Sequence, residues 1–181
     1  MPFVIDTAAR PTYVMRSDRP VPAVETGETG SAYIERNAEA LGDLGFEDVA
    51  ELVRGLHTMD AETLAAAVDR ENAKRAKRRW VWTLRVPTPA QVAHVRDESR
   101  AGQGADRYRL GTWELWTLRY GVAGVRGDAE CTTPPPEWRE PSPGIAGDSV
   151  FATISTDARN ELANAAAELV RVTEADRGNF G

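Results

Sequence analysis

The residues best suited to acid–base or metal chemistry are few and far apart in this sequence. Histidine is the side chain whose ordinary pKa lies nearest to neutral pH, and the chain has two, His57 and His94. The single cysteine, Cys131, lies 37 residues beyond His94, the same separation as between the histidines. This spacing matches no recognised zinc motif, and one cysteine excludes an intramolecular disulfide. We therefore expect no catalytic residue and no metal site.

The strongest concentration of charge is a basic run that ends directly before two tryptophans. Its five cations could hold the phosphates of single-stranded nucleic acid, while Trp80 and Trp82 could stack on bases. The same residues also suit a helix end followed by a core strand, because cations offset the helix dipole and alternating tryptophans commonly pack inside. The formal net charge of −6 does not favour nucleic acid, which is kept only as an alternative. The run comprises Lys74, Arg75, Lys77, Arg78 and Arg79.

Other motif-like features lack the context that their chemistry needs. Residues 121–127 carry three glycines, but no GK[ST] follows and no strand is predicted before them, so we expect no nucleotide cofactor. Acidic pairs such as Asp97 and Glu98 fall on predicted helix surfaces, where solvated charge is normal.

The elements that would position these residues are mainly helices. Apolar spacings of three and four predict helices over 31–42, 43–56 and 61–76, the last one capped by Asp60. Residues 80–86 alternate with period two and predict the clearest strand.

The second half of the chain begins with a helix-start signature. Thr88 offers a capping hydroxyl, Pro89 suits the first helical position, and Gln91 can bond back to the cap. A further helix over 106–120 is expected to end in a left-handed cap at Gly121.

The remaining residues predict a loop, a strand and a helix. Glycines and prolines concentrate in 121–149, where we expect a long surface loop without regular structure, pinned at its middle by Trp138. A short strand over 150–154 and a C-terminal helix over 155–177 follow.

The first 30 residues show no helical period and are expected to form an extended arm. Two short apolar runs, 3–5 and 13–15, are followed by Pro20 and Pro22, which restrict that part to edge or polyproline conformations. The arm could pack on a neighbouring molecule or close the domain's own sheet as an edge hairpin, and both alternatives stay open. The candidate partner-interface residues are Phe3, Ile5, Tyr13, Met15 and Trp138.

Together these elements predict a single, mainly helical α+β domain with a small sheet. The arm covers 1–30 and the α+β body 31–181, and the sheet is expected to contain residues 80–86, residues 150–154 and part of the arm. With 181 residues, 41% of them apolar, the chain is long enough to bury a core of its own. It has no long apolar run and no signal-peptide pattern, so we expect a soluble intracellular or viral protein without membrane contact.

Three parts of the sequence resemble proteins of tailed bacteriophages. The strand in 82–92, which turns through Pro87 and Thr88 into a helix, and the later helix end at 119–128 are similar in layout to small phage tail-assembly chaperones and related virion-accessory proteins. Residues 157–179 resemble the closing helix and acidic, asparagine-containing tail of that group, and residues 12–20 resemble its start. These parts cover about half of the chain.

The resemblance implies a non-enzymatic structural or accessory protein of a tailed-phage particle, present in the virion and, during assembly, in the host cytoplasm. Its implied partners are other phage structural proteins and copies of itself. Two alternatives stay open: a tail assembly chaperone, and a small nucleic-acid-binding protein that uses the run 74–79. On the leading hypothesis we expect partners to hold the chain ends and the loop 121–149 in place. Deletion of residues 1–24 is then expected to abolish incorporation and leave the helical body folded.

Overall fold

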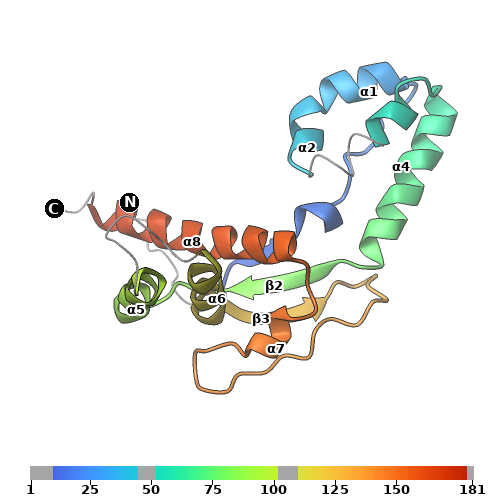
Figure 1. The fold of residues 1–181 in the computed structure, drawn as a ribbon. Helices are drawn as coiled ribbons and strands as arrows, with labels where there is room; N and C mark the ends of the chain where they lie inside the picture. Colours follow the sequence, from blue (N-terminus) through green and yellow to red (C-terminus); the bar gives the residue numbers. More distant parts are fainter. Residues whose placement is uncertain (1–9, 45–51, 102–109, 179–181) are drawn as a thin grey trace, which may run out of the picture. The chain divides into compact units, whose positions relative to one another are not determined.

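Two compact units make up the computed structural model of this chain. The structure describes residues 10–44, 52–101 and 110–178, with side chains to residue 170. Unit 1 comprises residues 1–13, 81–126 and 135–181, and unit 2 comprises residues 14–80 and 127–134. Helices predominate beside one antiparallel sheet of three strands (Figure 1), so the predicted mainly helical α+β class is confirmed.

Unit 2 contains two short helices where the sequence predicts one. α1 spans Gly30–Arg36 and α2 spans Ala38–Gly42, with the break at Asn37. The Asn37 side chain donates a hydrogen bond to the carbonyl of Tyr33 at 2.9 Å. Asparagine favours helix ends over helix interiors because its amide competes in this way for backbone groups.

The main helix of unit 2 forms as predicted. α4 spans Ala61–Ala76, and the Asp60 carboxylate accepts a hydrogen bond from the backbone N–H of Thr63 at 2.8 Å. Residues 52–56 are helical, while the first part of the helix predicted over 43–56 lies outside the described residues.

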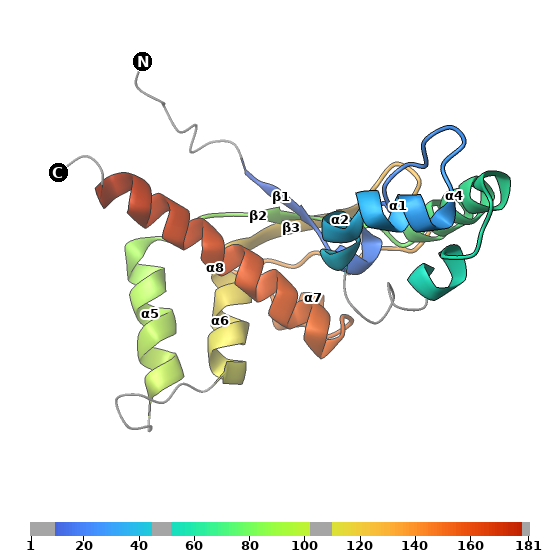
Figure 2. The same cartoon turned by 90° about the horizontal axis from the view of Figure 1, so that it is seen from above.

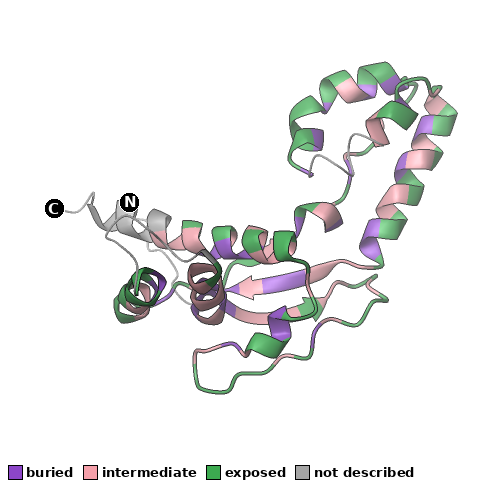
Figure 3. Ribbon diagram, in the orientation of Figure 1, coloured by how far each residue is buried: buried purple, intermediate pink, exposed green. Residues whose placement is uncertain are grey.

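An apolar cluster forms the core of unit 2, and Figure 3 shows buried residues along one side of α4. Part of the predicted arm belongs to this core. Asn72 exchanges two hydrogen bonds with the backbone of Val21, and the Tyr33 hydroxyl donates to the carbonyl of Pro22 at 2.7 Å. Burial raises the pKa of Tyr33 to about 12. The buried members are Val21, Tyr33, Leu41, Leu44, Leu56, Leu64 and Val68.

The sheet has the strand order β1-β2-β3, with β1 over Thr12–Val14, β2 over Trp80–Leu84 and β3 over Val122–Gly127. β2 confirms the predicted central strand. β1 comes from the predicted arm and pairs with β2, so residues 12–14 form an edge of the chain's own sheet as a single strand. The first apolar run of the predicted edge hairpin, 3–5, lies outside the described residues.

Two predictions for the last part of the sequence are wrong. Residues 122–127, inside the predicted loop, form β3, and residues 150–154 are not a strand. α7 spans Asp148–Phe151 and a turn follows. Both sides of β2 are already paired, so the apolar pair Val150 and Phe151 is buried from a short helix instead of from a strand.

β3 carries one residue more than the strand it pairs with. The backbone N–H of Asp128 donates to the carbonyl of Arg79 at one end, and the N–H of Arg85 donates to the carbonyl of Gly121 at the other. Between these bonds the five residues of β2 lie opposite the six residues of β3. The extra residue is a β-bulge, a device that twists an edge strand and hinders further pairing along it.

Three longer helices pack in unit 1. α5 spans Pro89–Arg100, α6 spans Leu110–Gly121 and α8 spans Thr156–Gly178. α5 and α6 run side by side and α8 crosses α6 (Figure 2). The predicted capping box at the start of α5 is confirmed, and α8 confirms the predicted C-terminal helix. No helix in the described part of the chain is long and apolar enough to span a membrane.

Gly121 ends α6 for a reason other than the predicted left-handed cap. In the described residues, the glycines with positive φ are Gly27 and Gly144, so Gly121 does not adopt that conformation. A Cβ atom built on Gly121 would lie 2.6 Å from the Cβ atom of Ala166 on α8. Glycine is required here because the end of α6 packs directly against α8.

Candidate functional site

Arg75, one of the five cations of the predicted nucleic-acid run, is fully buried within unit 2. Its Nε donates to the Glu71 carboxylate at 2.8 Å. Its Nη1 donates to the backbone carbonyls of Ser17 at 3.0 Å and Arg19 at 3.4 Å. A buried cation with several partners in its own chain is not available to bind phosphate.

Arg78 and Arg79 bind the same short segment. The segment is the 3-10 helix η1, Arg16–Asp18. Arg78 pairs with the Asp18 carboxylate at 3.0 Å and donates to the carbonyl of Ser17 at 3.0 Å. Arg79 donates to the carbonyl of Asp18 at 2.9 Å and to the Asp128 carboxylate at 3.2 Å. Arg75, Arg78 and Arg79 thus form an arginine clamp that holds η1 against the end of α4.

Asp18, which the arginine clamp holds, is largely shielded from water. Burial raises the pKa of Asp18 above its ordinary value, and the positive charge of Arg78 partly offsets that rise. An aspartate beside three arginines would otherwise be expected to titrate low. Desolvation therefore outweighs attraction at this position.

The other members of the predicted nucleic-acid surface are divided. Lys74 pairs with Glu71 at 3.7 Å, and Lys77 is exposed. Trp82 is fully buried, with its ring stacked on Phe151 at a centroid distance of 6.3 Å, and the Trp80 indole N–H donates to the carbonyl of Thr133. The arrangement does not favour the nucleic-acid alternative, because the cations and aromatic faces it needs mostly have partners inside the chain.

The histidines and the cysteine lie in different settings. His57 is exposed at the end of the 52–56 helix, and its carbonyl accepts a hydrogen bond from the Ser31 hydroxyl. His94 packs edge-on against Trp116, with ring centroids 4.5 Å apart. The Cys131 thiol lies 3.2 Å from the carbonyl of Thr133. Across the side chains that the structure describes, within 10–44, 52–101 and 111–170, no three of His, Cys, Asp or Glu are arranged to hold a metal ion.

The five predicted partner-interface residues also separate. Phe3 and Ile5 lie outside the described residues. The Tyr13 hydroxyl donates to the Glu161 carboxylate of α8 at 2.7 Å, and Met15 is only 5% exposed. Trp138 is half-buried. Tyr13 and Met15 therefore make contacts within the chain. Less of the described arm is exposed for contact with a partner than the sequence predicts.

The segment between β3 and α7 is held in place by two arginines of unit 1. Arg85 donates to the carbonyls of Tyr120 and Arg119 at the end of α6 and pairs with Glu140 at 3.1 Å. This ion pair lowers the pKa of Glu140 below its ordinary value. One side chain thus satisfies helix-end carbonyls and fixes the loop.

The second arginine fixes the far end of the same segment. Arg119 donates through Nε to the Asp148 carboxylate at 2.6 Å, and its guanidinium lies over the ring of Trp116 at 4.4 Å from the centroid. The backbone N–H of Ala146 donates to the carbonyl of Arg119 at 2.9 Å. Gly144, with φ of 76°, supplies the left-handed turn between these anchors.

The expectation that partners hold the loop 121–149 stays a prediction, and the structure adds contacts of the loop within the same chain. Glu140 of this stretch pairs with Arg85, which follows β2, while Ala146 and Asp148 bond to Arg119 of α6. The sequence did not reveal the tie, because Arg85 and Glu140 are 55 residues apart and no local pattern pairs them.

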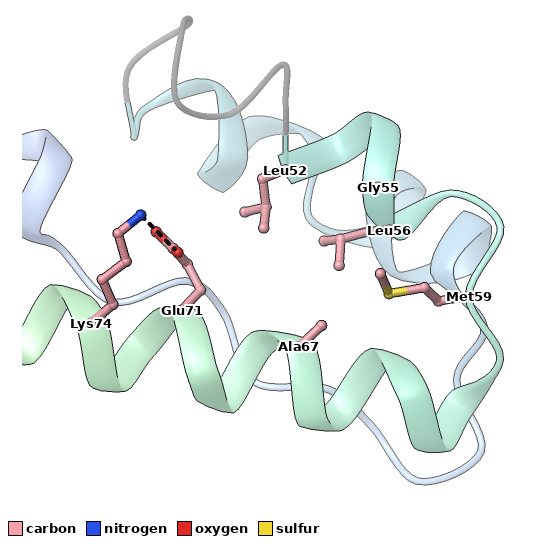
Figure 4. Close-up of a pocket in the computed structure, with 7 residues that line it drawn as sticks. All are labelled: Leu52, Gly55, Leu56, Met59, Ala67, Glu71 and Lys74. Carbon is pink, nitrogen blue, oxygen red and sulfur yellow. Dashed lines mark ion pairs between the residues drawn. The ribbon is translucent and has the colours of Figure 1, made fainter.

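Among the described residues, a shallow groove lies in each unit. In unit 2, a groove of about 330 Å³ lies between the 52–56 helix and α4 (Figure 4). Leu52, Leu56 and Met59 point toward Ala67, and the Glu71–Lys74 pair lies at one end. In unit 1, a groove of about 380 Å³ lies between α6, α7 and α8. Its apolar lining includes Leu115, Leu118 and Phe151, and its charged rim residues are already paired, as Arg159 with Glu114 and Asp148 with Arg119.

No family model, curated protein or solved structure matches this chain.

Proposed function

We propose that this chain is a non-enzymatic structural or accessory protein of a tailed-phage particle that acts through protein–protein contacts. The sequence resemblance over 82–92, 119–128 and 157–179 supports this proposal. Its partners would be other phage structural proteins and copies of itself, in the virion and, before that, in the host cytoplasm.

The observation that carries the proposal is the apolar run near the start of the arm, together with the finding that the described residues of the arm make contacts within the chain. From Thr12 onward the segment belongs to the chain's own structure, through β1, the arginine clamp and the core residue Val21. Residues 1–9 precede the outermost strand of the sheet and contain the apolar run Phe3-Val4-Ile5. This run is the part of the arm that we propose to contact a neighbour.

In the proposed mechanism, the run Phe3-Val4-Ile5 would pair as an extended strand with the sheet edge of another protein. The edge strands of the chain's own sheet are poorly suited to accept a strand from another protein, because β1 has three residues and β3 carries a bulge. Short and bulged edge strands resist pairing with a further strand. The chain would therefore donate a strand and would not accept one.

A truncation tests this proposal, and the structure sets where it must stop. Removing residues 1–24 would also remove β1 and Val21 and would damage the fold, so the informative variant lacks only residues 2–9. It should keep the circular dichroism spectrum and the melting temperature of the full chain, yet disappear from tailed particles purified from cells that carry the gene. A matched control changes Thr7→Ser and Ala8→Ser and leaves the apolar run intact.

Mass spectrometry of the purified particles separates the proposal from its nearest alternative. A structural component should be present in finished particles at a fixed ratio to the other proteins. A tail assembly chaperone should be found in the lysate during assembly and be absent from finished particles. Normal incorporation of the chain without residues 2–9 would contradict the role of the arm.

A further inference from the structure

We draw no further inference here: the strongest candidate, the apolar groove that Leu115, Leu118 and Phe151 line between α6, α7 and α8, is an unpartnered surface, and nothing in the structure shows what covers it.

Discussion

Arginines hold an irregular segment in each unit, but they are buried to very different extents. In unit 2 the side chain of Arg75, at the centre of the arginine clamp, is 1% exposed. In unit 1 the side chains of Arg85 and Arg119 are 21% and 22% exposed. Charged contacts are stronger away from water, and a buried charge that loses its partners is costly. Arg75 therefore belongs to the core of unit 2, whereas the arginines of unit 1 fix a surface loop. The other two members of the clamp, Arg78 and Arg79, lie nearer the surface, with side chains 39% and 17% exposed.

The largest expected effect on stability comes from removing the buried arginine of unit 2. Arg75→Ala removes the donor to the carbonyl of Arg19 and the shorter of the two ion pairs of Glu71, and it leaves Ser17 with Arg78 as its remaining donor. We expect a loss of about 3–5 kcal/mol in the free energy of unfolding, measured by urea denaturation. The neighbouring exposed residue gives the control, since Lys77→Ala should change stability by less than about 0.5 kcal/mol. Similar values for the two variants would show that Arg75 is not part of the core.

Arg85→Ala tests the more exposed arginine contacts of unit 1. It removes donors from two carbonyls at the end of α6 and from Glu140, and we expect a loss of about 1.5–3 kcal/mol. The pKa of Glu140 should rise toward its ordinary value, because the hydrogen bond from Arg85 is the main cause of its depression. Nuclear magnetic resonance titration of the carboxylates can measure this rise. Arg126→Ala, an exposed change on β3, is the control.

A glycine substitution sharpens the description of how unit 1 packs. Gly121→Ala places a methyl group against Ala166 and should destabilise the protein by about 1–3 kcal/mol. Combining it with Ala166→Gly should cost less than the sum of the two single changes. Gly111→Ala is the matched control on the same helix, where a Cβ atom meets nothing within 4 Å and should add up to about 1 kcal/mol of stability. Simple additivity in the double variant would contradict direct packing of α6 on α8.

The smallest expected effect concerns an ion pair near the surface of unit 2. Glu28 pairs with Arg36 at 2.7 Å, which lowers the pKa of Glu28 to about 2 from an ordinary value of 4.5. A depressed folded-state pKa stabilises the protein above pH 4.5, and this contribution is lost as the pH falls toward 2. Glu28→Gln and Arg36→Ala should both flatten the pH dependence of unfolding in that window. An unchanged slope in both variants would rule out the contribution of this pair.

Elements with a strong local signal could be predicted from the sequence. Asp60 at the start of α4, the capping box before α5 and the alternation in β2 each depend on residues a few positions apart. The other elements depend on which segments, far apart in the sequence, pair with one another. The run at 150–154 has the composition of a strand, yet β1 and β3 already flank β2, so its apolar residues are buried from α7.

The contacts of the candidate site could not be predicted from local sequence patterns either. The run 74–79 has the composition of a phosphate-binding surface, and nothing within it reveals that Asp18 and the carbonyls of η1 lie next to its arginines. Those contacts join residues about 60 positions apart. Likewise, the proline and glycine content of 121–149 predicts a loop correctly over much of its length but gives no sign of its anchors on Arg85 and Arg119.

Amide hydrogen exchange of the isolated monomer in dilute buffer tests most directly whether the chain alone holds these segments. The informative backbone amides are those of Val21, bonded to Asn72, and of Ala146 and Gly147, bonded to the carbonyls of Arg119 and Arg139. We predict that all three exchange far more slowly than in an unstructured peptide, with no partner present. Exchange at the unstructured rate in the monomer, with protection gained only when a partner is added, would contradict this account.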